Sequence, residues 1–194
     1  MITFEEKSHK YSIDNVPAVG VNELLKSFGI GDCSHIPEHI LAPAADFGKK
    51  GHLMARYHFE NRLDEENLDN KLKPYLVGLK KLCSGHKIEP LAIEKKIGFK
   101  ALMVCGTPDL VCMFDGVKTI LDWKFVRAIR KSSHLSTGGY VYIANTGLEP
   151  EEKVKQAKII HMLPNDYKII DVEYDAVNEF KALLLAWHIQ KAYK

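Results

Sequence analysis

The sequence predicts an α/β fold, in which a central mixed β-sheet is flanked by helices. Apolar residues recur at helical spacing over residues 67–83, and the pattern then changes to short runs rich in β-branched and apolar residues. A further helix, two strands and a closing helix follow, and this order of elements is typical of an α/β sandwich. The length of 194 residues matches one ordinary domain, so we expect a single domain over residues 1–194.

The first element is a β-hairpin, indicated by short alternating runs over residues 2–19 around Asp14-Asn15. Helices are expected over 21–28, 37–62 and 67–83, and Pro43 and Gly48 are points at which the second could break. Strands are expected over 92–99, 102–114 and 117–125. A helix over 133–145, strands over 155–163 and 168–174, and a helix over 176–193 complete the chain.

The composition narrows the class of protein. Hydrophobic residues make up 46% and charged residues 27%, as in soluble globular proteins. The apolar stretches are too short to cross a bilayer and no signal segment opens the chain, so we expect a cytoplasmic protein with no membrane partner. The cysteines lack CxxC spacing and are expected to be reduced (Cys33, Cys83, Cys105, Cys112). A net charge of +2 neither requires nor excludes a nucleic-acid partner.

Asp115-Gly116, between two β-like runs, predicts a two-residue type I′ hairpin loop. Phe114 then lies opposite Val117, and every opposed pair of residues has the same sum of residue numbers. Asp109 and Asp122 share that sum, so they should be cross-strand partners with Cβ atoms roughly 4.5–5.5 Å apart. A three-residue loop would shift the register and undo this pairing.

Two opposed carboxylates on strands that are apolar on both faces would repel each other. A hard divalent cation, Mg²⁺ or Mn²⁺, would resolve the conflict by binding oxygens of both. Lys124 follows Asp122 by two residues, so its ammonium projects from the same face and is suited to a phosphodiester hydrolase. An Asp-x-Lys triplet is expected by chance about once in a chain of this size, so the triplet alone is a weak signal. The alternative is that either aspartate lies in solvent at a strand end.

These residues resemble the motifs of the PD-(D/E)XK nucleases, in particular the RecB-like and phage exonuclease branch. Its pattern of Glu, Gly-x-x-Asp and Asp-x-Lys matches Glu94, Gly106-Thr-Pro-Asp109 and Asp122-Trp-Lys124. Gly48-Lys-Lys-Gly-His52 matches an upstream Gly-x-x-x-His element, and Ser136-Thr-Gly-Gly-Tyr140 corresponds to a downstream Gln-x-x-x-Tyr. The opening His9-Lys-Tyr11 also resembles small phage members, so the resemblance covers nearly the whole chain.

The resemblance implies a role for each matched residue. Asp109 and Asp122 would bind Mg²⁺ or Mn²⁺ with Glu94, His52 would add an imidazole ligand, and Lys124 would position the attacking water. The alternative for His52 is that it is an ordinary helix histidine with no metal. The alternative for Tyr140 is that it is an aromatic residue of the core or of an interface. Ser136 stands in place of the family glutamine, and Arg56 stands where many members have an acid. An iron–sulfur cluster is not expected, because no cysteine follows Cys112.

Substrate contacts are expected on two further segments. Arg127, Arg130 and Lys131 follow Lys124 closely and could bind phosphates, although an ordinary solvated loop is the alternative. Ser136 and Tyr140 share one helix face and should look over the Asp109–Asp122 site. Gly138-Gly139 in the same helix predicts that either the sheet or DNA approaches its backbone closely.

Three functions remain open from the sequence. The first is a DNA exonuclease of phage or prophage recombination, replication or repair, acting on single strands or duplex ends. The second is a structure-specific or restriction-type endonuclease on the same fold. The third is a weakened nuclease that binds DNA. A single-strand-binding or recombination protein is a further candidate partner.

Overall fold

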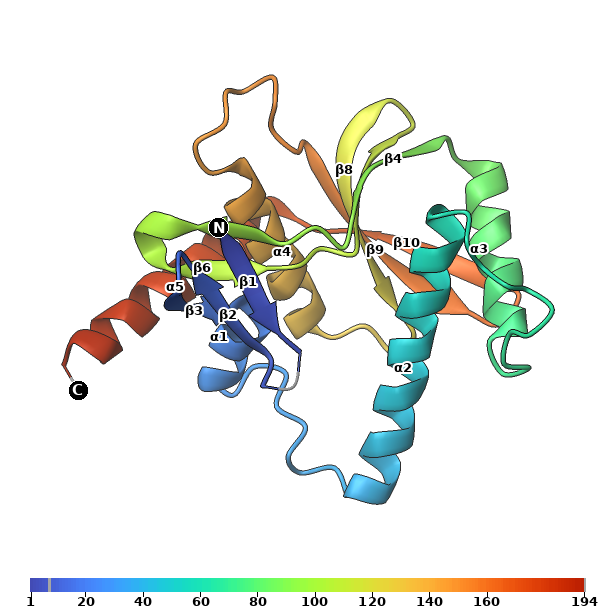
Figure 1. Cartoon of the computed structure of the whole chain (residues 1–194), viewed down its shortest axis with the longest axis horizontal. Coiled ribbons are helices and arrows are strands. Elements are labelled where there is room, and N and C mark those ends of the chain that lie inside the picture. Colours follow the sequence, from blue (N-terminus) through green and yellow to red (C-terminus); the bar gives the residue numbers. More distant parts are fainter. Residues whose placement is uncertain (7, 194) are drawn as a thin grey trace.

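Ten strands form two five-stranded sheets, and five α-helices lie around them, in the computed structural model, which describes residues 1–6 and 8–193 (Figure 1). The α/β class predicted from the sequence is confirmed. A second sheet, which was not predicted from the sequence, carries half of the strands. Both sheets are mixed, since each contains one parallel pair of strands. None of the helices in the described ranges is long and apolar enough to cross a membrane.

The large sheet carries the acidic hairpin. Its strand order is β10 (Asp166–Asp171), β9 (Gln156–Leu163), β8 (Val117–Lys124), β7 (Leu110–Phe114) and β4 (Ile88–Ile93). Strands β8 and β9 run parallel, and the other neighbours run antiparallel. The crossover between β8 and β9 contains helix α4 (Lys131–Asn145), as expected for a parallel connection.

The small sheet is built from the N-terminal strands and a hairpin from the middle of the chain. Its order is β1 (Ile2–Glu5), β2 (Lys10–Ile13), β3 (Val16–Gly20), β6 (Val104–Gly106) and β5 (Ile97–Phe99). The expected N-terminal hairpin is therefore part of a three-stranded unit. Asp14 and Asn15 form the β2–β3 turn with φ values of 50° and 65°, which are the left-handed conformations that a type I′ turn requires.

The helices divide into two groups, one on each face of the large sheet. Helices α2 (Glu38–Phe59) and α3 (Lys73–Gly85) share a core with Leu121 and Trp123 of β8. Helices α1 (Val21–Ser27), α4 and α5 (Tyr174–Ala192) share another core with Ile120. Because side chains alternate along a strand, Asp122 projects to the same side as Ile120.

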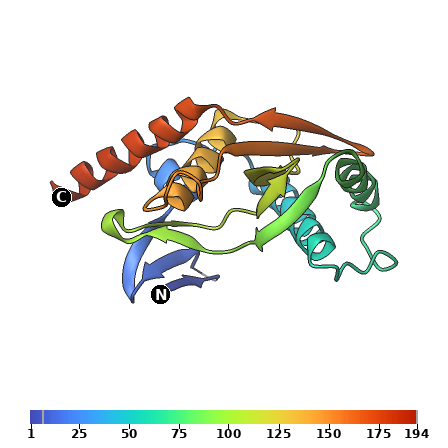
Figure 2. The ribbon, with the colours of Figure 1, turned by 90° about the horizontal axis from the view of Figure 1, so that it is seen from above.

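Helix α4 lies between α5 and the small sheet (Figure 2). Gly138 and Gly139 allow α5 to approach, because added Cβ atoms would lie 2.7 Å from the Ala176 backbone and 2.7 Å from the Phe180 ring. The close neighbour that this glycine pair predicts is therefore a helix, and the expectation of the sheet or DNA is wrong.

Two of the expected strands are each divided between the sheets. Residues 92–99 contain the end of β4 and all of β5, separated at Glu94, whose φ is 44°. Residues 102–114 contain β6 and β7, separated by Thr107-Pro108-Asp109. Both segments carry apolar residues on either side of the break, so periodicity alone gives no sign of it. The carboxylates of Glu94 and Asp109 thus lie where the chain passes from one sheet to the other.

Two helix expectations also need correction. Helix α2 is continuous through Pro43 and Gly48, since Pro43 lies near its N-terminus, where a missing backbone donor costs little. Helix α3 begins at Lys73 rather than near Asn67, because Pro74 occupies its first turn and Asp69 accepts a hydrogen bond from the Lys71 backbone N–H in a turn before it.

Candidate active site

The hairpin between β7 and β8 has the register that the sequence predicts. Phe114 pairs with Val117, and Leu110 pairs with Leu121. Asp115 and Gly116 have φ values of 50° and 84°, the left-handed conformations of a type I′ loop. Asp109 directly precedes β7, and one further step of the same register places it across from Asp122. Its backbone carbonyl accepts a hydrogen bond from the Glu94 N–H at 2.9 Å, which ties the two motif segments together.

Asp122 is almost completely buried, with 3% of its surface exposed. Lys124 Nζ lies 2.5 Å from Asp122 Oδ2, and the two side chains form an ion pair. Among residues 1–6 and 8–193, that oxygen is paired with the Lys124 ammonium and accepts no further hydrogen bond. Burial raises the pKa of Asp122, and repulsion from Asp109 adds to the rise, although Lys124 acts against it. A buried carboxylate in this state favours the approach of a cation.

Asp109 is held by a histidine and by the backbone of β8. His52 Nδ1 lies 3.0 Å from Asp109 Oδ1, and the Trp123 N–H donates to Asp109 Oδ2 at 2.8 Å. Burial alone would raise the pKa of Asp109, but attraction from His52 and Lys124 and these hydrogen bonds lower it. The pKa of His52 is raised in return, since Asp109 outweighs the effect of burial.

Gly51 explains how α2 brings His52 to the site. An added Cβ at Gly51 would lie 2.6 Å from the ring of Phe125, which directly follows Lys124. The helix can therefore lie against the end of β8 only because this residue has no side chain. The sequence drew attention to Gly48 instead, where an added Cβ would meet nothing within 4 Å.

Glu94 is paired with the residue that departs from the family pattern. Arg56 Nη1 donates to Glu94 Oε2 at 2.9 Å, while Arg56 Nε donates to Glu60 Oε1 at 2.8 Å. Burial raises the pKa of Glu94 despite the nearby guanidinium. The sequence marked Arg56 as unusual but gave no sign of this contact, because the two residues are far apart along the chain.

The chemistry of the donor set fits a hard divalent cation. Asp122, Asp109 and Glu94 offer carboxylate oxygens, and His52 offers an imidazole nitrogen. Each carboxylate, however, already faces a donor side chain. Asp122 faces Lys124, Asp109 faces His52, and Glu94 faces Arg56. The described ranges accordingly contain no group of three or more His, Cys, Asp or Glu side chains arranged to hold a metal ion.

The expected substrate residues fall in different places. Ser136 lines a hollow together with Lys124, and its hydroxyl donates to the Ser133 carbonyl at 3.0 Å. Tyr140 is buried and lines a neighbouring hollow, and burial raises its pKa well above the ordinary value, with Asp122 and Asp109 adding to the rise. Ser136 thus lies in a hollow beside Lys124, and Tyr140 lies near the carboxylates.

The three basic residues after β8 do not gather at the carboxylates. Arg127 is exposed in the loop between β8 and α4. Arg130 approaches Cys33 Sγ at 3.9 Å, and Lys131 Nζ lies 2.8 Å from Glu179 of α5. Arg130 and Lys131 both line a separate, largely apolar hollow that includes Ile30, Leu135 and Leu183.

Asn22 and Lys26, on the exposed face of α1, were not singled out from the sequence. Both line the hollow that contains Lys124 and the one that contains Tyr140. Their spacing of four residues is ordinary for a solvated helix face, so the sequence offers no signal that would find them.

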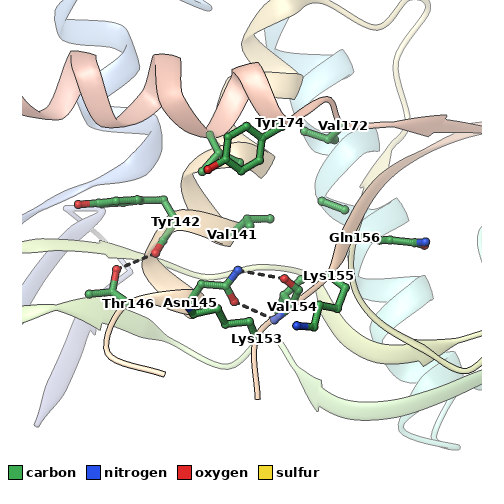
Figure 3. A pocket seen from close by; sticks show the side chains of 12 residues that line it. Val141, Tyr142, Asn145, Thr146, Lys153, Val154, Lys155, Gln156, Val172 and Tyr174 are labelled. Carbon is green, nitrogen blue, oxygen red and sulfur yellow. Dashed lines mark hydrogen bonds between the residues drawn. The ribbon is translucent and has the colours of Figure 1, made fainter. Parts of the chain in front are cut away.

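A hollow of about 470 Å³ lies between α4, β9 and α5 and contains none of the predicted site residues (Figure 3). The Asn145 amide at its edge donates to the Val154 carbonyl at 3.0 Å and accepts from the Val154 N–H at 2.8 Å. Both amide groups are thus used to hold the loop between α4 and β9. This hollow therefore lacks the reactive groups that the carboxylate site has.

No protein-family model matches the chain, and no curated protein matches it at a significant level. The arrangement of the residues is therefore the basis for assigning a function.

Proposed function

We propose that this protein is a Mg²⁺- or Mn²⁺-dependent deoxyribonuclease of the PD-(D/E)XK superfamily, acting as an exonuclease in phage or prophage recombination, replication or repair. The observation that carries the proposal is Asp122: a buried carboxylate beside Asp109, whose Oδ2 is paired with the ammonium of Lys124. An arrangement that needed only stability would replace such a buried charge with an apolar residue. The order of motifs in the sequence supports the choice of superfamily, and the choice of exonuclease rests on the resemblance to its RecB-like and phage exonuclease branch.

The residues divide the work of phosphodiester hydrolysis. Asp109, Asp122 and Glu94 would hold the metal, with His52 beside them, and a bound metal supplies positive charge at the phosphate and a more acidic water. In the reaction the water gives up a proton to solvent as its oxygen bonds to phosphorus, the bond to the leaving sugar oxygen breaks with its electron pair, and that oxygen takes up a proton from solvent. Lys124 contributes an ammonium that offsets the charge growing on the phosphate oxygens.

The test is to incubate the protein with three DNA substrates in Mg²⁺, Mn²⁺ or EDTA. The substrates are an end-labelled linear duplex, an end-labelled single strand and a closed circle. A linear duplex and a single strand should shorten from their ends with either metal, while a closed circle stays intact. Cleavage of the circle would favour the endonuclease on the same fold. Full activity in EDTA would overturn the metal-dependent mechanism.

A second candidate function is DNA binding without turnover. It is favoured by the donor side chains that face the carboxylates, above all Arg56 on Glu94. Tight binding of DNA with no cleavage in Mg²⁺ or Mn²⁺ would select this alternative.

A further inference from the structure

Two adjoining hollows lie along α1 and lead away from the carboxylate site. One, of about 250 Å³, contains Lys124 and the α4 residues Ser132, Ser133 and Ser136. The other, of about 500 Å³, lies between α1, Tyr140 and the strands β1 and β2. Asn22 and Lys26 line both hollows, which therefore adjoin along α1, and we call the two together the α1 groove.

The far end of the α1 groove is aromatic. Phe4 and Tyr11 have ring centroids 4.5 Å apart, and His9 meets Phe4 edge-on at 5.7 Å. The Tyr11 hydroxyl is 2.9 Å from Thr107 Oγ1, in the segment that leads to Asp109. Phe4 is only half-buried and His9 is exposed, so these two rings offer free faces, whereas Tyr11 is fixed beneath them. Such rings provide a stacking surface that any base can use.

The rest of the α1 groove suits an anion. Lys10 and Lys26 line its wider part, and Lys26 also lines the narrow part, together with Lys124 and three serines of α4. Glu23 is the acid among the described lining residues, and its carboxylate accepts a hydrogen bond from the Gly20 N–H at 3.3 Å, which caps α1. Ammonium groups and hydroxyls are the groups that proteins use to hold phosphates.

We propose that the α1 groove is a subsite for an unpaired nucleotide of the DNA strand, next to the phosphate that is cleaved. The base stacks on Phe4 and packs against His9, and the adjoining phosphate lies between Lys26 and the serines of α4. A volume of about 500 Å³ lies within the range of roughly 300–1,000 Å³ that is usual for ligand pockets, so the groove takes a nucleotide but not a duplex. This inference rests on the proposed function and makes an unpaired end the preferred substrate.

The test compares binding of a blunt duplex with that of the same duplex carrying a short single-stranded tail with 2-aminopurine. Binding is measured by fluorescence anisotropy in EDTA, where no cleavage occurs. Phe4→Leu keeps an apolar side chain but removes the stacking surface, and Lys26→Ala removes the ammonium that would bind the phosphate. Each should weaken binding of the tailed duplex at least fivefold and leave blunt-duplex binding within twofold. Phe4→Leu should also abolish the quenching of 2-aminopurine that stacking causes.

Matched controls lie away from the α1 groove. Tyr193→Leu removes an aromatic ring that is 88% exposed after α5, and Lys168→Ala removes an exposed lysine of edge strand β10. Both should bind the tailed duplex as the wild type does. Phe4→Trp restores a stacking surface and should restore quenching, which separates stacking from a general loss of structure in β1.

The outcomes separate the subsite from the nuclease proposal. In one outcome the wild type cleaves DNA, and the Phe4 and Lys26 variants either bind both duplexes as the wild type does or bind both more weakly by the same factor. The subsite is then wrong and the nuclease proposal stands. If the variants lose only the tailed duplex while no metal supports cleavage, the nuclease proposal is wrong and the groove is a binding site alone.

Discussion

The guanidinium of Arg56 is bound to the carboxylate of Glu94, with Nη1 2.9 Å from Oε2, and it also holds Glu60. Glu94 is the residue expected to complete a metal site, yet its nearest charge is positive. Arg56 therefore competes with any cation for the same carboxylate. This competition gives the first test of the site.

Arg56→Ala should lower the Mg²⁺ concentration that gives half-maximal cleavage by about three- to tenfold, because on the order of 1 kcal/mol of repulsion is removed. The measurement is a Mg²⁺ titration at pH 8, because burial raises the pKa of Glu94 and a higher pH favours its ionised form. Arg62→Ala is the control, since Arg62 contacts Glu60 at 3.2 Å as well. Equal responses of the two variants would show that Arg56 does not act through Glu94.

Asp122→Asn should abolish cleavage, because it removes charge from the metal site while keeping its shape. Without metal the variant should be as stable as the wild type or more stable. The pKa of Asp122 is raised in the folded protein, so its contribution to stability is present below the unfolded pKa and is lost as pH rises through the folded pKa. Asparagine carries no ionisable carboxyl group, so the variant does not lose this stability as the pH rises. Urea unfolding at pH 4 and pH 8 measures the difference.

The control for Asp122→Asn is Asp171→Asn, on the exposed edge strand β10, where Asp171 pairs with Lys158. This variant should cleave DNA normally. A large loss of stability in Asp122→Asn at pH 8 would mean that Lys124 compensates the buried charge well, which contradicts a role for the Asp122 carboxylate in attracting a further cation.

Lys124→Ala should reduce cleavage by orders of magnitude while retaining much of the DNA affinity, since its ammonium lies at the reacting centre. Arg127→Ala and Arg130→Ala should instead weaken binding and lower the salt dependence by about one unit of slope for each phosphate that is no longer bound. Anisotropy over a range of salt concentrations and single-turnover cleavage give both quantities. Identical behaviour of all three variants would mean that binding and chemistry are not divided in this way.

Ser136→Gln should leave the fold intact and raise cleavage severalfold, which corresponds to about 1 kcal/mol of transition-state stabilisation. The longer amide can reach along the hollow that Ser136 shares with Lys124, whereas the serine hydroxyl is bonded to its own helix at Ser133. Ser136→Ala is the control and should change cleavage little. A lower rate for Ser136→Gln would show that serine is an adaptation of this protein.

Gly138→Ala should destabilise the protein by about 1–3 kcal/mol, because the new Cβ would lie 2.7 Å from the Ala176 backbone and α5 would have to move. Gly48→Ala is the matched change in an open position of α2, where nothing lies within 4 Å. It should stabilise the protein by up to about 1 kcal/mol through helix propensity. Thermal unfolding of the two variants checks both signs.

Local patterns predicted the parts of this structure that depend on neighbouring residues. Asp115-Gly116 fixed the β7–β8 register, because a type I′ loop leaves one way to pair its strands. The division of residues 92–99 and 102–114 between two sheets could not be predicted in this way. Apolar residues continue on both sides of each break, and the partner strands of β5 and β6 include β3, which is distant in sequence. Pairing over such distances leaves no local pattern.

The same limit applies to the candidate site. Asp109, Asp122 and His52 meet as their motifs predict. The contact of Arg56 with Glu94 and the place of Lys26 depend on how α1 and α2 pack, and exposed charged residues on a helix have the same pattern whether or not they border a site.

The Asp115-Gly116 loop is about 20 Å from Asp109 along an extended strand, yet it decides what Asp109 faces. Surface loops usually tolerate changes of length among related proteins. Here one inserted residue would shift the register, so that each side chain of one strand projects from the opposite face of the sheet. Asp109 would then lie opposite an apolar side chain in place of Asp122. Homologues that keep the activity should therefore vary freely in the composition of this turn and hardly at all in its length.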